Sequence, residues 1–266
     1  MYVNDLEKFI HSAIKFFADD TSLFSIVNDP TTTALELNHD LKLISDWAFQ
    51  WKMCFNPDPD KPAEEVLFSQ RKDNVDHPPL YFNDSIVKRV DSHKHLGLTL
   101  DSKLNFRIHI NEKISKARKW IGIIKQLSSY IPFNSLVQIY KMHIRPHLDY
   151  CDVIFHIPIL TNDFDSSMSL NFSMGILERT QYQAALAITG TWKGTNRNKI
   201  YEELGLETLD HRRYFHQLVL IYKIVNALTP LYLKDPIPLR NRFSHRLPSY
   251  IPTMPYRTDR YQIFFP

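Results

Sequence analysis

Apolar and polar positions at the start of the chain predict a β-hairpin with two acidic residues at its tip. Phenylalanine, leucine and isoleucine, which favour strands, fill two short runs between Ile14 and Ile26. Asp19 and Asp20 separate the runs and have the short polar side chains that tight turns tolerate. Because paired carboxylates beside buried aromatic residues repel each other, we expect a compensating cation, and such oxygen ligands suit Mg²⁺. On these residues alone, an ordinary Asp-Asp turn remains the alternative.

In the segment that follows the hairpin, apolar residues recur at the spacing of one face of a helix. A capping box at 33–36 opens a predicted helix that ends near Trp51. Its apolar face consists of Leu37, Leu41, Ile44, Ala48 and Trp51. Short strands are expected after it, at 52–55, 65–69, 80–82 and 85–90, with a hairpin turn at Asn83-Asp84. Residues 1–101 therefore mix one helix with several strands.

Beyond residue 101 the apolar spacing is helical. Helices are expected at 105–128, 133–147, 176–189, 199–204 and 209–228. Pro146 argues against an unbroken second helix, because proline removes a backbone donor and crowds the preceding turn. A polar loop at 157–173 separates residues 102–156 from 157–233, and the Pro-rich residues 234–266 are expected to be partly disordered or to dock along the helices.

Two of these helices carry polar residues that bear on their packing. Gln181 interrupts the apolar stripe of the helix at 176–189, which consists of Leu177, Ala184, Ala185 and Ile188. The helix at 209–228 is expected to bury Leu218, Ile221, Tyr222 and Val225. We interpret Arg212 and Arg213 at its start as surface residues that keep the helix soluble.

Charge is concentrated in one helix rather than in the chain as a whole. The formal net charge is only +3. Between residues 103 and 125, however, there are seven basic residues and only one acid, Glu112. The basic residues are Lys103, Arg107, Lys113, Lys116, Arg118, Lys119 and Lys125. A helix of like charges repels itself unless a polyanion lies nearby, so this surface predicts phosphate contacts. A merely solvated face is the alternative.

The cysteines, histidines and hydropathy of the chain bear on three other features: disulfides, membrane segments and a zinc site. Two cysteines, Cys54 and Cys151, do not suggest a disulfide framework and fit a reduced intracellular compartment. No stretch predicts a signal peptide or a membrane anchor. His143, His147 and Cys151 are spaced four apart with Asp152 adjoining, which is compatible with zinc on an unbroken helix. Pro146 and the lack of a clear fourth ligand make this the less favoured hypothesis.

Three motifs occur in an order that carries a resemblance to a known family. They are Phe17-Ala18-Asp19-Asp20, the loop Asn56-Pro57-Asp58-Pro59-Asp60-Lys61, and His95-Leu96-Gly97. In this order they resemble the polymerases of non-LTR retrotransposons, particularly the jockey-like elements, and the resemblance extends from Met1 to about Leu233. Each motif is weak singly, and their order makes the resemblance specific.

The resemblance implies an α+β fold and an RNA-directed DNA polymerase. Residues 1–101 would form part of a palm, an antiparallel sheet with a catalytic hairpin and a packed helix, followed by a basic helical thumb at 102–156 and a helical connection region at 157–233. Asp19 and Asp20 would bind Mg²⁺ in a two-metal site, and Lys61 would lie near the triphosphate of the dNTP. His95, Leu96 and Gly97 would form the primer grip. The RNA template and DNA primer would lie against the thumb at Lys113, Lys116, Arg118 and Lys119.

The same resemblance implies that the chain begins within the palm. None of its residues matches the family's first metal-binding aspartate, its Gln-Gly template motif or the fingers that hold the nucleotide. We therefore expect a truncated product with little or no polymerase activity by itself. The alternative is a non-catalytic nucleic-acid-binding remnant that uses the helix at 103–125 and whose binding survives Asp20→Ala. The sequence leaves the oligomeric state open.

Overall fold

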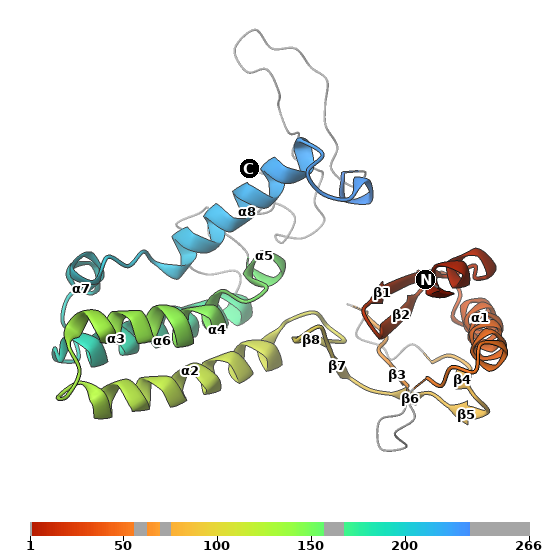
Figure 1. Cartoon of the computed structure of the whole chain (residues 1–266), viewed down its shortest axis with the longest axis horizontal. Helices are drawn as coiled ribbons and strands as arrows, with labels where there is room; N and C mark the ends of the chain where they lie inside the picture. Colours follow the sequence, from red (N-terminus) through yellow and green to blue (C-terminus); the bar gives the residue numbers. More distant parts are fainter. Residues whose placement is uncertain (1, 56–62, 70–75, 157–167, 235–266) are drawn as a thin grey trace, which may run out of the picture. The chain divides into compact units, whose positions relative to one another are not determined.

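The computed structural model describes residues 2–55, 63–69, 76–156 and 168–234, and the chain divides after Leu104 into two compact units (Figure 1). The first unit combines small sheets with one long helix, and the second is helical over its described part. This mixture of helices and small sheets is compatible with the predicted α+β class. None of the helices in the described ranges is both long and apolar enough to cross a bilayer.

A hairpin packed on a long helix dominates the first unit. The 3-10 helix η1 (Tyr2–Phe9) leads into strands β1 (Ala13–Phe17) and β2 (Asp20–Phe24), and helix α1 (Pro30–Gln50) follows. Their shared core consists of Leu6, Ile14, Ile44, Trp47 and Ala48. The hairpin predicted from the sequence is therefore present, and α1 supports one of its faces.

Asp40 of α1 fixes the segment that leads into β1. Its side chain is fully buried and accepts hydrogen bonds from the backbone N–H groups of Ser12 at 2.7 Å and His11 at 3.2 Å. Burial by itself would raise the pKa of Asp40, but these hydrogen bonds outweigh burial and lower the pKa. Sequence periodicity did not single out this residue, because an acid on a helix is normally solvated.

Helix α1 begins earlier than the sequence pattern predicted. Asp29 is its N-cap and accepts a hydrogen bond from the backbone N–H of Thr32 at 2.8 Å, while Pro30 occupies the first turn. The predicted capping box at 33–36 is therefore wrong. Aspartate followed by proline is the stronger start signal, because proline lacks only a donor that the first turn leaves unpaired anyway.

The remaining strands of the first unit are short and pair in separate ladders. They are β3 (Glu64–Glu65), β4 (Tyr81–Phe82), β5 (Ser85–Ile86), β6 (Lys88–Arg89), β7 (Ser92–His95) and β8 (Leu98–Asp101). The pairs β4–β5 and β7–β8 are antiparallel, whereas β3 and β6 are parallel. Among the described residues these pairs do not join into the one antiparallel sheet that was expected, and 52–55 forms no strand. The expected turn at Asn83-Asp84 is confirmed, with positive φ at both residues.

The second unit is helical, and its first helix is α2 (Arg107–Leu127). The others are α3 (Phe133–Ile139), the π-helical turn η2 (Tyr140–Ile144), α4 (Arg145–Asp149), α5 (Asp152–Phe155), α6 (Met168–Thr189), α7 (Arg197–Leu204), α8 (Leu209–Val225) and the 3-10 turn η3 (Leu231–Leu233). Helix α2 packs against α3, η2, α4 and α6. Figure 1 shows α3 and α6 alongside α2. The predicted apolar stripe of α2 is confirmed, because Ile110, Ile114, Ala117, Ile121 and Ile124 are all buried. Helix α6 begins earlier than expected, within the predicted loop.

Pro146 produces a π-helical turn rather than a break. The helical path continues from α3 through η2 into α4, with the proline in the first turn of α4. A π turn widens the helix, which relieves the clash between the proline ring and the preceding carbonyl. His143 lies within this turn, so its angular position differs from that on an ordinary α-helix.

Helix α8 packs through polar residues, contrary to the sequence prediction. Its buried residues are Leu209, Arg213, Gln217 and Ile224, whereas Leu218 and Tyr222, expected inside, are exposed. The interpretation of the two arginines as solubilising residues is also wrong. Arg212 forms an ion pair with Asp149 at 2.8 Å, and Arg213 is only 1% exposed.

Candidate functional site

Asp19 and Asp20 lie at the tip of the β1–β2 hairpin. Phe17 pairs with Asp20 across the hairpin, so Ala18 and Asp19 form a two-residue turn, with a φ of 54° at Ala18. Both aspartates are exposed, and among the described residues neither forms an ion pair. Their carboxylates are therefore accessible to a ligand from solution.

The two faces of this hairpin differ in burial. Ile14, Phe16 and Leu23 pack against the core with α1. Asp20 lies on the opposite face in register with Phe17, which is 61% exposed, and the neighbouring Phe24 is 50% exposed. Phe17 and Phe24, which were expected to be buried beside the acids, are thus exposed, whereas Phe16 is half-buried. Water can solvate the two charges, so repulsion between them does not by itself require a cation.

The hairpin tip carries two carboxylates of the chemical kind that Mg²⁺ binds. Nowhere in the described ranges do three histidine, cysteine, aspartate or glutamate residues gather in a group that could hold a metal ion. Mg²⁺ commonly takes one or two protein carboxylates and completes its shell with water and substrate phosphates. Asp19 and Asp20 fit that mode of binding and do not form an all-protein cage.

A second turn lies close to this hairpin. Strands β7 and β8 pair through His95 and Leu98, which leaves Leu96 and Gly97 as a two-residue turn with φ values of 46° and 81°. Positive φ at both positions is the type I′ geometry, which glycine adopts freely and leucine adopts with strain. The Oγ of Ser22 lies 3.5 Å from the Nδ1 of His95. The structure therefore brings the predicted primer-grip residues to the face of the hairpin that carries Asp20.

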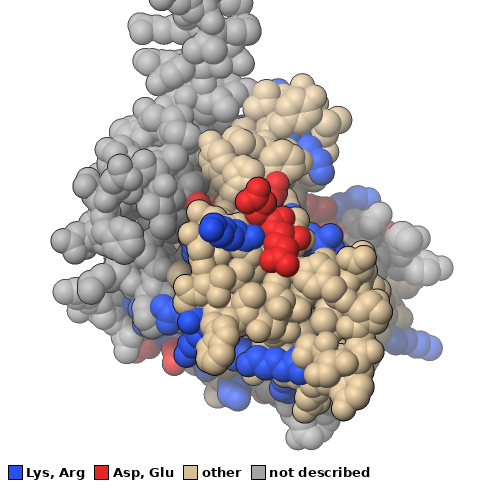
Figure 2. All heavy atoms as spheres, turned by 90° about the vertical axis from the view of Figure 1, so that its left-hand side faces the viewer, with Lys and Arg blue, Asp and Glu red and all other residues tan. Residues whose placement is uncertain are grey.

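The cations of α2 lie along both sides of its buried stripe. Arg107, Lys116, Arg118, Lys119 and Lys125 are exposed, whereas Lys113 is half-buried with its Nζ 4.0 Å from the centre of the Tyr150 ring. Figure 2 shows that Lys and Arg on one face of the molecule are spread among uncharged residues, around a compact group of Asp and Glu. Positive charge therefore does not cover that face as one continuous patch.

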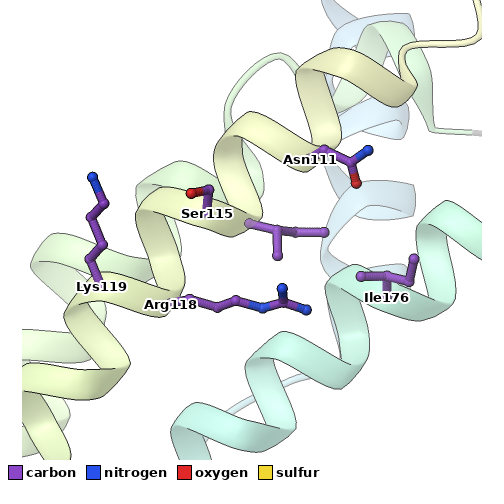
Figure 3. Close-up of a pocket in the computed structure, with 6 residues that line it drawn as sticks. Asn111, Ser115, Arg118, Lys119 and Ile176 are labelled. Atoms are coloured by element: carbon purple, nitrogen blue, oxygen red, sulfur yellow. The ribbon is translucent and has the colours of Figure 1, made fainter.

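A pocket of about 550 Å³ lies beside α2, facing α6 (Figure 3). Its lining residues are Asn111, Ile114, Ser115, Arg118, Lys119 and Ile176. Figure 3 shows that Arg118 extends across the gap toward α6, while Lys119 points away from it. The guanidinium group of Arg118 is thus placed to meet an anionic group that enters between the two helices.

The predictions for Lys61 and for a zinc site have different outcomes. Lys61 lies outside the described residues, together with the Asn56–Lys61 loop, so its predicted role stays a prediction. The histidines of the zinc hypothesis do not converge with Cys151 in the described part of the chain. His143 stacks on Trp120, with ring centroids 4.0 Å apart, and Cys151 lies beyond the end of α4.

Comparison with known proteins gives similarity to two curated relatives. One relative is an RNA-directed DNA polymerase from mobile element jockey of Drosophila melanogaster. The two sequences are 28% identical over 142 residues, which cover 52% of this chain. The other relative is the RNA-directed DNA polymerase from mobile element jockey of Drosophila funebris. The two sequences are 25% identical over 156 residues, which cover 56% of this chain. These matches span only 15% and 16% of the relatives' own lengths.

The other comparisons give no match, either to a protein-family model or to a solved structure. The resemblance predicted from the three motifs is nevertheless confirmed, because both curated relatives are polymerases of jockey elements. The chain is thus similar to part of a jockey-type reverse transcriptase.

Proposed function

We propose that the chain is a part of an RNA-directed DNA polymerase that binds the template and primer duplex. In this proposal residues 1–101 belong to the palm, 102–156 to the thumb and 157–233 to the connection region. The observation that carries it is the proximity of two motifs far apart in sequence, the acidic hairpin and the His95–Gly97 turn, through Ser22 and His95. The similarity to jockey polymerases supports the same conclusion.

Each proposed site residue has a separate task. Asp19 and Asp20 would hold Mg²⁺, which when bound activates the primer hydroxyl and stabilises charge on the leaving pyrophosphate. The strained turn at Leu96 and Gly97 would position the primer end close to that face of the hairpin. The cations of α2 would contact phosphates of the RNA template and DNA primer, and Lys61 would lie near the dNTP.

We expect Asp19 and Asp20 to bind a divalent cation weakly in the 266-residue chain. Mn²⁺, used as a paramagnetic probe of the Mg²⁺ site, should broaden the backbone amide NMR signals around Ala18 to Thr21, with a Kd on the order of millimolar because water completes the shell. The double variant Asp19→Asn, Asp20→Asn should lose the effect. Asp84→Asn, which alters an exposed carboxylate in another hairpin turn of the same unit, should retain it. Broadening that survives the double variant would contradict the assignment.

The 266-residue chain should extend a primer on an RNA template little or not at all. Two carboxylates without the family's remaining aspartate and its nucleotide-holding fingers leave both positioning and charge stabilisation incomplete. The measurement is primer extension with Mg²⁺ and labelled DNA primer. Robust synthesis that disappears in Asp19→Asn would show that these residues suffice, and our expectation would be wrong.

A further inference from the structure

A cluster of lysines and histidines lies where α2 packs against η2 and α4. Lys113 and Lys116 of α2 are three residues apart, and His143 of η2 and His147 of α4 are four residues apart, so each pair is separated by about one helical turn. Lys116 is exposed, and the other three side chains are half-buried. We call these four residues the α2–α4 basic cluster.

Aromatic residues hold two members of the cluster in place. Trp120 stacks on His143 with an interplanar angle of 16° and ring centroids 4.0 Å apart. Tyr150 lies under the ammonium group of Lys113, with 4.0 Å from Nζ to the ring centre. Such contacts reduce the freedom that these side chains would lose on binding a ligand.

Among the described residues, six histidines lie near a carboxylate, and the two histidines of the cluster belong to those that do not. His11, His77, His93, His156, His211 and His216 each lie 2.7 to 3.7 Å from a carboxylate. Within the described ranges, His143 and His147 form no such pair. Asp149, the acid on α4, is instead paired with Arg212 of α8, and Glu112 of α2 adjoins Lys113.

Burial lowers the pKa of His147, and the charges of Lys113, Lys116 and His143 lower it further. In the free protein His147 is therefore mostly neutral near pH 7. A phosphate bound among the lysines would cancel their repulsion and raise the pKa of His147. Binding would then take up a proton, since the complex holds more protons than the free protein between the two pKa values.

We propose that the α2–α4 basic cluster binds a phosphate of the nucleic acid and that its affinity increases on mild acidification. This inference rests on the proposed function, because it assigns the partner and a mode of regulation to the basic surface of α2. It requires the lysines for charge and His147 for the response to pH. Neither histidine needs a metal ion for this role.

The test is fluorescence anisotropy of the full 266-residue chain with a labelled RNA·DNA hybrid at constant ionic strength. Between about pH 7.5 and about pH 6.0, the wild-type Kd should fall several-fold, toward the limit of about tenfold per pH unit for one linked proton. His147→Gln should flatten this dependence. His211→Gln, which replaces an exposed histidine of α8, should leave the dependence unchanged.

The outcomes separate this inference from the proposed function. Binding that depends on salt and has the same pH slope in wild type and His147→Gln would overturn the inference alone. No binding at any pH would overturn both. His147→Asn gives a second variant if His147→Gln melts at a lower temperature, and it should flatten the pH dependence in the same way, because asparagine also lacks a titratable side chain.

Discussion

Replacement of Arg213 by alanine should destabilise the helical unit by about 3 to 5 kcal/mol. The side chain is 1% exposed and donates from Nη2 to the backbone carbonyl of Leu148 at 3.4 Å. Burial lowers the pKa of Arg213, while the nearby carboxylates of Asp152 and Asp149 act to raise it. Alanine would leave those acids buried without this cation and would open a cavity.

Urea denaturation followed by circular dichroism measures this effect. Arg212→Ala is the matched control, because the neighbouring residue forms an ion pair with Asp149 but is 22% exposed at its side chain. It should cost about 1 kcal/mol, in the range of a partly exposed ion pair. Equal losses in the two variants would contradict the assignment of Arg213 as a buried structural cation.

Neutralising four of the exposed cations of α2 should reduce affinity for an RNA·DNA hybrid at least tenfold at about 0.1 M salt. The variant replaces Lys116, Arg118, Lys119 and Lys125 by glutamine, which keeps the helical propensity and leaves the contact between Lys113 and Tyr150 intact. The expected loss follows from the condensed counterions that phosphate contacts release.

A matched variant separates local contacts from net charge. Lys193, Arg197, Lys199 and Lys223 are exposed, lie in the same unit outside α2, and can be replaced by glutamine as a set. This control removes the same number of charges and should reduce affinity only slightly. Equal losses in the two sets would show that binding responds to total charge, and α2 would lose its assigned role.

Local patterns in the sequence predicted those helices and strands that bury apolar side chains. The β1–β2 hairpin and the stripe of α2 follow from the alternation of apolar and polar residues. The inner face of α8 did not, because Arg213 and Gln217 occupy it and periodicity counts only apolar residues. Gln181 is a similar case, since it is buried and bonds to the hydroxyl of Tyr140 and the carbonyl of Glu207.

The parts of the candidate site could be found from motifs, but their proximity could not. Asp19, Asp20 and the His95–Gly97 turn were identified by order and residue type. Their approach through Ser22 and His95 depends on packing between segments 73 residues apart. The pairing of short strands was also missed, because a strand of two residues carries no detectable period.

The salt dependence of hybrid binding tests most directly whether α2 is the nucleic-acid interface of a polymerase-like chain. The measurement is the slope of log K against log salt concentration for wild type and for the four-residue α2 variant. We predict that the variant's slope is shallower by up to about 3.6, since each of the four lost phosphate contacts contributes about 0.9 on a duplex. Parallel lines for the two proteins would place the phosphate contacts elsewhere and contradict the proposed interface.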